Sequence, residues 1–216
     1  MKALFHVHTN FSQDGSISPK SLAEFAQKNQ IDLLVITDHN EIKGAQETQR
    51  IASVPVIVGE EIQTKEGGEI IGLFLQKCIP RDISVFGAIK EIRQQNGIVY
   101  LPHPFDKIRT KQFSNTILEM IAPQVDIVEV FNSRNIANKA NIDALKYALK
   151  YNKIQCVGAD AHSLIELKSS FVIFNSEINS PITMLDTLRK SQLHPQRSPL
   201  RVHLLSKILS LSRKFS

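Results

Sequence analysis

Two pairs of metal-binding side chains are each separated by a single residue in this sequence. His6 and His8 lie near the N-terminus, and Asp160 and His162 lie far downstream. Side chains alternate between the two faces of a β-strand, so residues i and i+2 point the same way and can chelate one ion. Imidazole and carboxylate ligands without thiolate suit Zn, Mn or Fe, and a carboxylate can bridge two ions. The two pairs therefore predict a metal site.

Further metal-binding side chains stand just after short apolar runs, or a few residues beyond the first pair. They are Asp14, Asp38, His39, Glu60, Glu61, His103 and Asn132. If the apolar runs are parallel strands of a barrel, their carboxyl ends share one face, and side chains far apart in the sequence converge there. We therefore expect one cluster of these residues. Asp38 is as suited to orienting a ligand histidine as to binding an ion itself.

Eight short runs rich in Val, Ile, Leu or Phe have the length and composition of strands. They are Lys2–Val7, Leu33–Thr37, Pro55–Val58, Ile70–Leu75, Ile98–Leu101, Ile127–Phe131, Gln155–Gly158 and Phe171–Phe174. Amphipathic stretches lie between them, and the first begins at Ser18-Pro19 and reaches about Asn29. This alternation predicts an α/β fold with a parallel sheet wrapped by helices, and about seven such units favour closure into a TIM-like barrel with the metal cluster at the carboxyl ends of the strands.

The chain has 216 residues, an ordinary length and composition for one globular domain. We expect the barrel to occupy residues 1–198. Residues 187–216 carry seven basic residues and no acidic one, while the preceding part has a net charge of −2. The positive charge therefore belongs to the tail, where residues 199–216 read as a basic amphipathic helix. Its role as a packing helix or as a contact to nucleic acid, membrane or another subunit stays open.

No apolar stretch approaches the roughly 20 residues needed to span a bilayer, and the first residues leave no room for a signal peptide. We therefore expect a cytoplasmic protein without a transmembrane segment. Cys78 and Cys156 each lie in or beside an apolar run, which favours free thiols over a disulfide. The oligomeric state is not indicated.

Four segments in order resemble the motifs of the PHP (polymerase and histidinol phosphatase) family of metal-dependent phosphoesterases. They are His-Val-His-Thr-Asn-Phe-Ser-Gln-Asp-Gly at 6–15, Ile-Thr-Asp-His at 36–39, Leu-Pro-His-Pro at 101–104 and Gly-Ala-Asp-Ala-His-Ser at 158–163. The resemblance covers roughly residues 3–190. It implies a distorted seven-unit barrel with two or three divalent metals in its cleft.

The resemblance also implies which residues hold each ion. One ion would be held by His6, His8, Glu61 and Asp160; a second by His103, with Glu61 as the bridge; and a third by Asp14, His39 and His162. The family pattern Gly-x-Glu selects Glu61 over Glu60. Asn132 stands where relatives supply His or Cys to the second ion, and Arg134 matches an Asn-x-Arg segment of similar proteins.

These ligands imply a hydrolase that breaks phosphate esters. A water that bridges two ions loses its proton near neutral pH, and the resulting hydroxide can attack phosphorus, so Glu61, His103, Asp160 and Arg134 are the expected catalytic residues. The substrate would be a phosphorylated small molecule or a nucleotide, with nucleic acid as an alternative partner. Two other functions stay open: hydrolysis of a C–N or C–O bond on the same barrel, and a non-catalytic metal-binding regulatory module.

Overall fold

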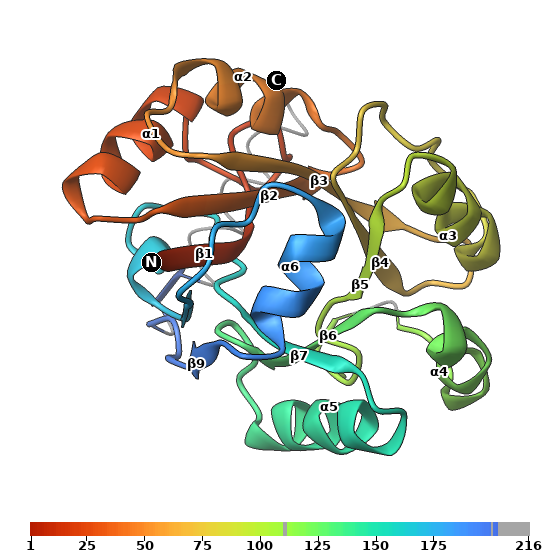
Figure 1. Ribbon diagram of the computed structural model, residues 1–216. Helices are drawn as coiled ribbons and strands as arrows, with labels where there is room; N and C mark the ends of the chain where they lie inside the picture. Colours follow the sequence, from red (N-terminus) through yellow and green to blue (C-terminus); the bar gives the residue numbers. More distant parts are fainter. Residues whose placement is uncertain (110–111, 200, 203–216) are drawn as a thin grey trace.

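The computed structural model describes residues 1–109, 112–199 and 201–202, and within them a single sheet of nine strands forms the centre of the molecule (Figure 1). The strands are β1 (Lys2–Val7), β2 (Leu33–His39), β3 (Val56–Gln63), β4 (Glu69–Leu73), β5 (Ile98–Leu101), β6 (Ile127–Asn132), β7 (Ile154–Gly158), β8 (Phe171–Ile173) and β9 (Gln192–His194). All eight predicted strands are present within a few residues of their expected ends.

The sheet has the order β7-β6-β5-β4-β3-β2-β1-β8-β9 and curls into a nearly closed barrel. The first residues of β1 pair with β8. Further along, β1 pairs with the chain that follows β7: the Ala159 amide donates to the Phe5 carbonyl at 2.9 Å, and the His8 amide donates to the Ala161 carbonyl at 2.8 Å. These bonds close the ring, so the predicted α/β barrel is confirmed.

The prediction of a parallel sheet is correct for β1 to β3 and for β5 to β7, but wrong for β4 and β8. The strand β9, which was not predicted, is antiparallel to β8. Residues 64–68 join β3 to β4 as a tight turn, in which Gly67 has a φ of 95°. A turn this short cannot cross back over the sheet, so β4 must run antiparallel to β3. The described residues therefore do not divide into seven equal strand–helix units.

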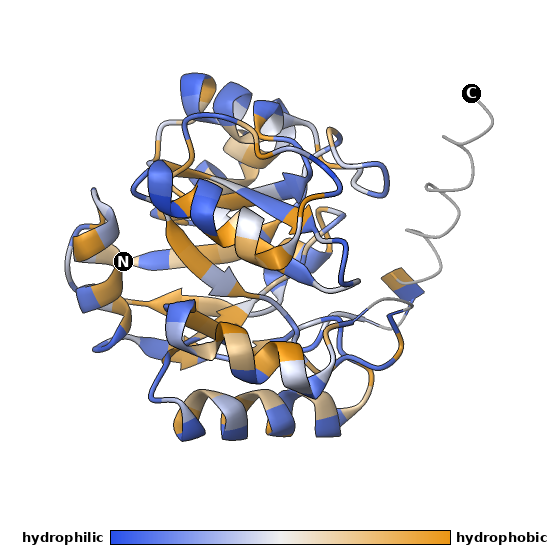
Figure 2. Cartoon of the chain, turned by 90° about the vertical axis from the view of Figure 1, so that its right-hand side faces the viewer, coloured by the Kyte–Doolittle hydropathy of each residue, from blue (hydrophilic) through white to orange (hydrophobic). Residues whose placement is uncertain are grey.

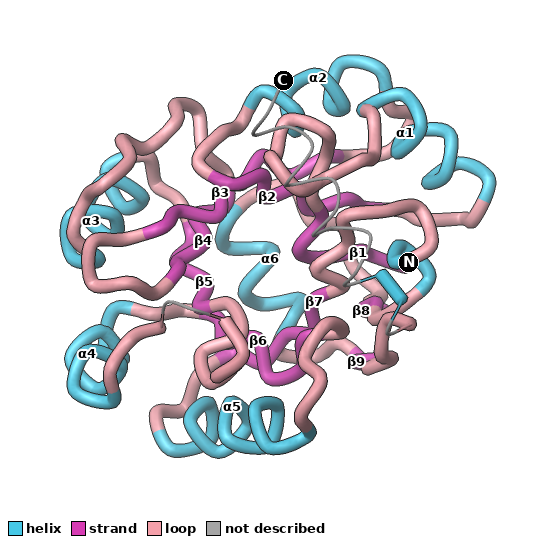
Figure 3. Tube along the Cα trace, turned by 180° about the vertical axis from the view of Figure 1, so that it is seen from behind, coloured by secondary structure: helices cyan, strands magenta, loops and turns pink. Residues whose placement is uncertain are grey.

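In the described part of the chain, five α-helices surround the ring of strands and a sixth covers one end of it, so that Figure 3 shows this sixth helix through the ring. They are α1 (Pro19–Lys28), α2 (Lys43–Ile51), α3 (Val85–Gln94), α4 (Asn115–Ile121), α5 (Asn138–Lys150) and, at the end of the barrel, α6 (Pro181–Leu188). Ser18, Ser84, Ser114 and Ser180 each precede a helix and accept a hydrogen bond from one of its first amides. The helix expected after Ser18 is confirmed.

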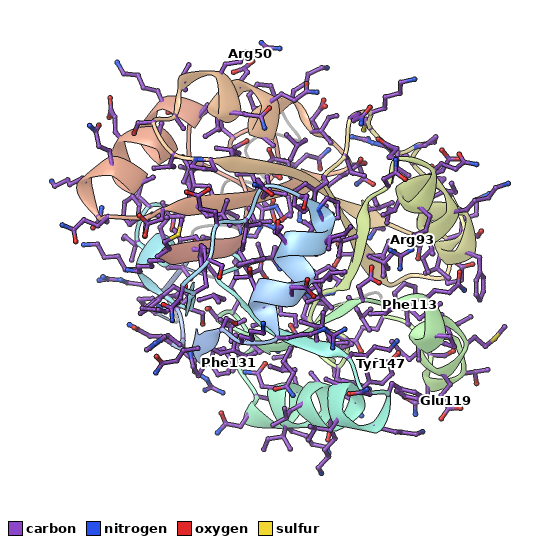
Figure 4. All side chains as sticks on the ribbon, viewed as in Figure 1. Arg50, Arg93, Phe113, Glu119, Phe131 and Tyr147 are labelled. Atoms are coloured by element: carbon purple, nitrogen blue, oxygen red, sulfur yellow. The ribbon has the colours of Figure 1, made fainter. Side chains whose placement is uncertain are left out.

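Two clusters of buried hydrophobic side chains fill the described part of the fold. The outer one joins the sheet to the surrounding helices, and Tyr147 in it also donates from its hydroxyl to the Leu118 carbonyl at 2.6 Å (Figure 4). The inner one contains residues from the beginnings of strands, such as Leu33, together with Met184 of α6. Figure 2 shows the largely apolar strands inside and polar segments on the outer helices. Since α6 fills one end of the barrel with apolar side chains, polar side chains gather at the other end.

Within the described ranges, no helix is long and apolar enough to cross a membrane. The predicted basic amphipathic tail lies outside the described residues except for positions 199, 201 and 202. Of these, Val202 is buried.

Candidate metal centre

A bulge in β1 sets the direction of the first histidine pair. Phe5 belongs to the inner cluster, so simple alternation would turn His6 outward. The register of β1 shifts between Leu4 and Val7, and His6 has a φ of 61°. The imidazoles of His6 and His8 consequently both point into the barrel, with ring centroids 5.1 Å apart. The two side chains converge as predicted, but the cause is the bulge.

Glu61, at the end of β3, lies at the centre of the cluster. Its Oε2 atom is 3.2 Å from Nε2 of His6, 3.3 Å from Nε2 of His8 and 3.3 Å from Nδ1 of His39. Its Oε1 atom is 2.8 Å from Nε2 of His103. The carboxylate of Glu61 is completely buried. Its two oxygens connect histidines from β1 and the residue after it, from β2, and from the chain after β5.

Glu60 points away from the cluster, as the choice between the two glutamates predicted. Its Oε2 atom accepts a hydrogen bond from the Ile79 amide at 2.8 Å, and its Oε1 atom lies 3.4 Å from the Cys78 sulfur. Burial raises the pKa of Glu60 to about 7. Adjacent strand residues face opposite sides of the sheet, which separates the two carboxylates.

Two acidic residues and His162 complete the cluster. Oδ1 of Asp160 lies 3.4 Å from Nε2 of His8. Oδ2 of Asp14 lies 3.1 Å from Nε2 of His162 and 3.8 Å from Nε2 of His39. Asp160 has a φ of 48°, and this left-handed backbone turns its side chain into the barrel mouth just after β7. The structure thus brings together residues that are up to 156 positions apart, from His6 to His162.

Hydrogen bonds at the other ring nitrogen fix how the histidines face the cluster. Nδ1 of His6 lies 2.8 Å from Oε1 of Glu129, and Nδ1 of His162 lies 2.9 Å from the Asp160 carbonyl oxygen. Both partners are acceptors, so each Nδ1 carries the proton. Each Nε2 therefore faces the cluster, and its lone pair becomes available to a metal once any proton on Nε2 is displaced.

Asp38 acts on the cluster through Ser12. Its carboxylate accepts from the Thr9 amide at 2.6 Å, the Thr9 hydroxyl at 2.7 Å and the Ser12 hydroxyl at 2.9 Å. The Ser12 oxygen in turn accepts from the His39 amide at 3.0 Å and lies 3.2 Å from Nδ1 of His8. Because the Ser12 proton is directed at Asp38, Ser12 accepts from His8. Asp38 was expected either to bind an ion or to orient a ligand histidine. Its contacts fit the second role, because they position His8 and His39 through Ser12.

Among the predicted metal ligands, four buried atoms lack a hydrogen bond of good geometry to any described residue. They are Nε2 of His8, Nε2 of His162, Oδ1 of Asp14 and Oδ1 of Asp160. Leaving such atoms without a partner costs free energy, and cations bound by these atoms would remove that cost. Several sets of three histidine and glutamate atoms also lie within 4.8 Å of one another. The donor set fits divalent metal ions.

The charges of the cluster shift the pKa values of its members. Burial lowers the pKa of His6, but the carboxylates of Glu61 and Glu129 outweigh it and raise this pKa well above its usual value. Burial raises the pKa of Glu61, yet His6 and the other imidazoles hold it well below its usual value. Burial, reinforced by His162, lowers the pKa of His8 well below its usual value. Metal binding to such a cluster displaces protons from imidazoles.

Glu129 of β6 is a site residue to which sequence reasoning gave no role. Its Oε1 atom accepts from Nδ1 of His6 at 2.8 Å and the Tyr100 hydroxyl at 2.9 Å. Its Oε2 atom accepts from the His103 amide at 2.9 Å and the Asn132 side-chain amide at 2.8 Å. With these four hydrogen bonds, the Glu129 carboxylate positions the predicted ligands His6 and His103. A buried acid within an otherwise apolar strand was the available signal.

Replacing Gly158 with Ala should disturb this support. The added Cβ would lie 1.7 Å from Oε1 of Glu129, so the Glu129 carboxylate must move. We expect the free energy of unfolding, measured by urea denaturation, to fall by about 3 kcal/mol. In the control Gly87→Ala on α3, the added Cβ would lie 2.7 Å from Cγ1 of Ile83 just before the helix, a milder overlap that is partly offset by the better helix propensity of Ala, and a change under about 1 kcal/mol is expected. Equal losses in the two variants would contradict the steric argument.

Arg109, in the loop after β5, also belongs to the site. Its guanidinium contacts the Asp160 carboxylate, and it lies 3.5 Å from the Glu69 carboxylate and 3.4 Å from that of Asp106. Arg134 was predicted to act at the site. It lies at the rim, 3.6 Å from the Glu166 carboxylate, and with Arg109 lines a cavity of about 180 Å³. No local motif marks Arg109 in the sequence.

The site and the nearly closed barrel define an α/β barrel protein with a histidine- and carboxylate-lined centre at the carboxyl ends of its strands. The PHP domain family matches residues 5–154 of the chain. The protein therefore belongs to the PHP domain family, as its four motifs predicted.

Similar proteins agree with this assignment. An uncharacterized protein of Methanocaldococcus jannaschii is 39% identical over 183 residues, which cover 83% of this chain and 72% of that protein. A two-domain protein from Bacteroides vulgatus, containing a predicted PHP-like metal-dependent phosphoesterase, has a TM-score of 0.73 at 18% identity, covering 91% of this chain and 65% of that one. Endonuclease Q in complex with a 27-mer duplex containing an abasic lesion has a TM-score of 0.65 at 13% identity, covering 88% and 56%. These structural likenesses establish the fold.

Proposed function

We propose that the protein is a metal-dependent phosphoesterase that binds two or three divalent ions at the mouth of its barrel. The observation that carries the proposal is the set of buried, unpartnered ligand atoms from His8, Asp14, Asp160 and His162, defined over the described residues. Membership of the PHP domain family supports the class of reaction.

The distances around Glu61 support the first of the three ligand sets implied by the sequence. His6 and His8 each approach the same oxygen of Glu61, at 3.2 and 3.3 Å. Two ligands on one Zn²⁺-sized ion lie roughly 3 to 3.5 Å apart, given bonds of about 2.0 to 2.2 Å. Together with Asp160, these residues would hold the first ion. His103 and Glu61 would hold the second, and Asp14, His39 and His162 the third.

Zn, Mn or Fe ions bound here would activate a water for attack on phosphorus and neutralise charge on the phosphoryl oxygens. Glu61 would join the first two sites, with His103 and Asp160 on either side of it. The cavity of about 180 Å³ between Arg109 and Arg134 is large enough for a phosphoryl group. Guanidinium groups match phosphate oxygens in shape and charge, so we assign Arg134 to binding the phosphoryl group.

A second cavity, of about 400 Å³, adjoins the first at Asp14. Polar and aromatic side chains line it, among them Phe11, Asn40, Gln63 and Arg81. A cavity of this size would take the alcohol part of a small phosphorylated metabolite or a nucleotide. Because endonuclease Q shares the fold and its structure holds a 27-mer duplex substrate with an abasic lesion, oligonucleotides belong in the same test.

The deciding experiment is a panel of phosphorylated sugars, amino-acid precursors, nucleotides and short oligonucleotides, assayed with metal-depleted protein and after addition of Mn²⁺. We expect hydrolysis of at least one phosphoester, and only after metal is restored. Full metal occupancy without any hydrolysis would favour the non-catalytic regulatory module. Release of an amine or an alcohol from substrates without phosphorus would favour the C–N or C–O hydrolase.

A further inference from the structure

Glu69 lies beside the metal centre although it belongs to none of the sequence motifs. It is the first residue of β4, and since β4 runs antiparallel to β3, this strand presents its beginning at the mouth of the barrel. Ile71, two residues further along, belongs to the inner apolar cluster, so Glu69 also faces inward. The Glu69 side chain is 13% exposed, which leaves it at the edge of the buried centre.

The two carboxylate oxygens of Glu69 face two different histidines. Oε1 lies 3.8 Å from Nδ1 of His39, and Oε2 lies 3.8 Å from Nε2 of His103. Atoms of His39, Glu61 and Glu69 all lie within 4.8 Å of one another and so could surround one ion. Glu69 therefore stands next to the pair, His103 and Glu61, assigned to the second ion.

Asn132, which the motifs place at that second ion, is turned the wrong way to bind it. Its side-chain nitrogen donates to Glu129 at 2.8 Å and to Asp160 at 3.1 Å, and its oxygen accepts from the Arg134 amide at 2.8 Å. Carboxylates only accept, so the NH2 group must face them. A donor group cannot ligate a cation. This orientation argues against Asn132 as a metal ligand and leaves the second ion with two protein ligands.

We infer that Glu69 is the missing ligand of the second metal ion and takes the place expected of Asn132. This inference rests on the proposed metal centre. The 3.8 Å between Glu69 and His103 exceeds the usual ligand spacing by a few tenths of an ångström, a gap that rotation of an edge side chain closes. The second ion then has two carboxylates and one imidazole, a set richer in oxygen that suits Mn²⁺.

Arg109 offers a competing explanation for Glu69. Its guanidinium lies 3.5 Å from Oε2 of Glu69 and also contacts Asp160. If Glu69 served only to hold Arg109, loss of either side chain would affect the metals equally. If Glu69 is a ligand, the second ion should bind more weakly without Glu69 but should still bind without Arg109. The two roles are therefore separable by metal binding.

The test is a Mn²⁺ titration in which the electron paramagnetic resonance signal counts the free ion. For Glu69→Gln we expect one site to weaken at least tenfold, while Arg109→Gln keeps that site within about threefold of the unchanged protein. The matched control is Asp82→Asn, which removes one negative charge from the same cavity at an exposed position. Circular dichroism of each metal-free variant verifies the fold.

Unchanged Mn²⁺ binding in Glu69→Gln would overturn the inference. Equal weakening in Arg109→Gln would assign Glu69 to holding the arginine, and equal weakening in Asp82→Asn would reduce the effect to charge alone. A protein that binds Mn²⁺ but hydrolyses no phosphoester would refute the proposed function and leave the assignment of Glu69 decided by the titration. A protein that binds no Mn²⁺ at its cluster would refute the assignment of Glu69, and one that binds none of Zn²⁺, Mn²⁺ and Fe²⁺ would also refute the proposed function.

Discussion

Replacing Glu61 with Gln should lower kcat/KM for a phosphoester substrate by about a thousandfold or more, the scale expected when a metal centre loses a shared ligand. The two Glu61 oxygens lie 2.8 to 3.3 Å from nitrogens of His6, His8, His39 and His103. Glutamine offers one oxygen and a donor NH2 group, so it cannot serve two ions. Steady-state kinetics at saturating Mn²⁺ measure the loss, and elemental analysis reports the bound metal.

Glu60→Gln is the matched control for this substitution. Glu60 is the adjacent residue, is equally buried, and binds the Ile79 amide instead of the histidines. Because burial raises the pKa of Glu60 to about 7, Gln resembles a form that this carboxyl already adopts near neutral pH. We expect kcat/KM within about threefold of the unchanged protein. Comparable losses in both variants would mean that Glu61 acts through folding.

Metal binding should raise the melting temperature by about 8 to 16 °C. A ligand at a thousandfold excess over its Kd stabilises the folded state by about 4 kcal/mol, and each kcal/mol shifts Tm by roughly 2 to 4 °C at this chain length. The gain arises because buried ligand atoms such as Nε2 of His8 and Oδ1 of Asp160 have no hydrogen-bond partner in the described part of the chain. Calorimetry of metal-depleted protein with added Zn²⁺ or Mn²⁺ measures the shift.

Two controls accompany the melting experiment. Ca²⁺ at the same concentration should shift Tm less, since it prefers six to eight oxygen ligands and this centre is rich in imidazole. Glu61→Gln should lose most of the Zn²⁺-induced shift. If neither Zn²⁺, Mn²⁺ nor Fe²⁺ moved the melting temperature of the unchanged protein, the cluster would not be a metal centre.

Much of the fold and the site could be predicted from local patterns. Short runs of β-branched and aliphatic residues are typical of buried strands, so the strand positions and the barrel followed from them. Metal-binding residues at the ends of those runs had to meet once the ends shared one face. The His6/His8 pair and Glu61 accordingly lie together. Their positions relative to the predicted strands were enough to predict that they meet.

The tertiary structure alone determined the rest. Glu69 reaches the cluster because β4 runs antiparallel to β3. The tight turn before β4 reverses the chain, and a search for alternating strands and helices overlooks such a turn. Arg109 reaches it from a loop, whose path depends on packing. Asparagine at position 132 could in principle bind a metal ion. The direction of its side-chain amide is decided by two acceptors, Glu129 of β6 and Asp160 after β7. Sequence spacing sets which residues can meet, whereas hydrogen-bond partners from distant strands decide which atom of each faces the metal.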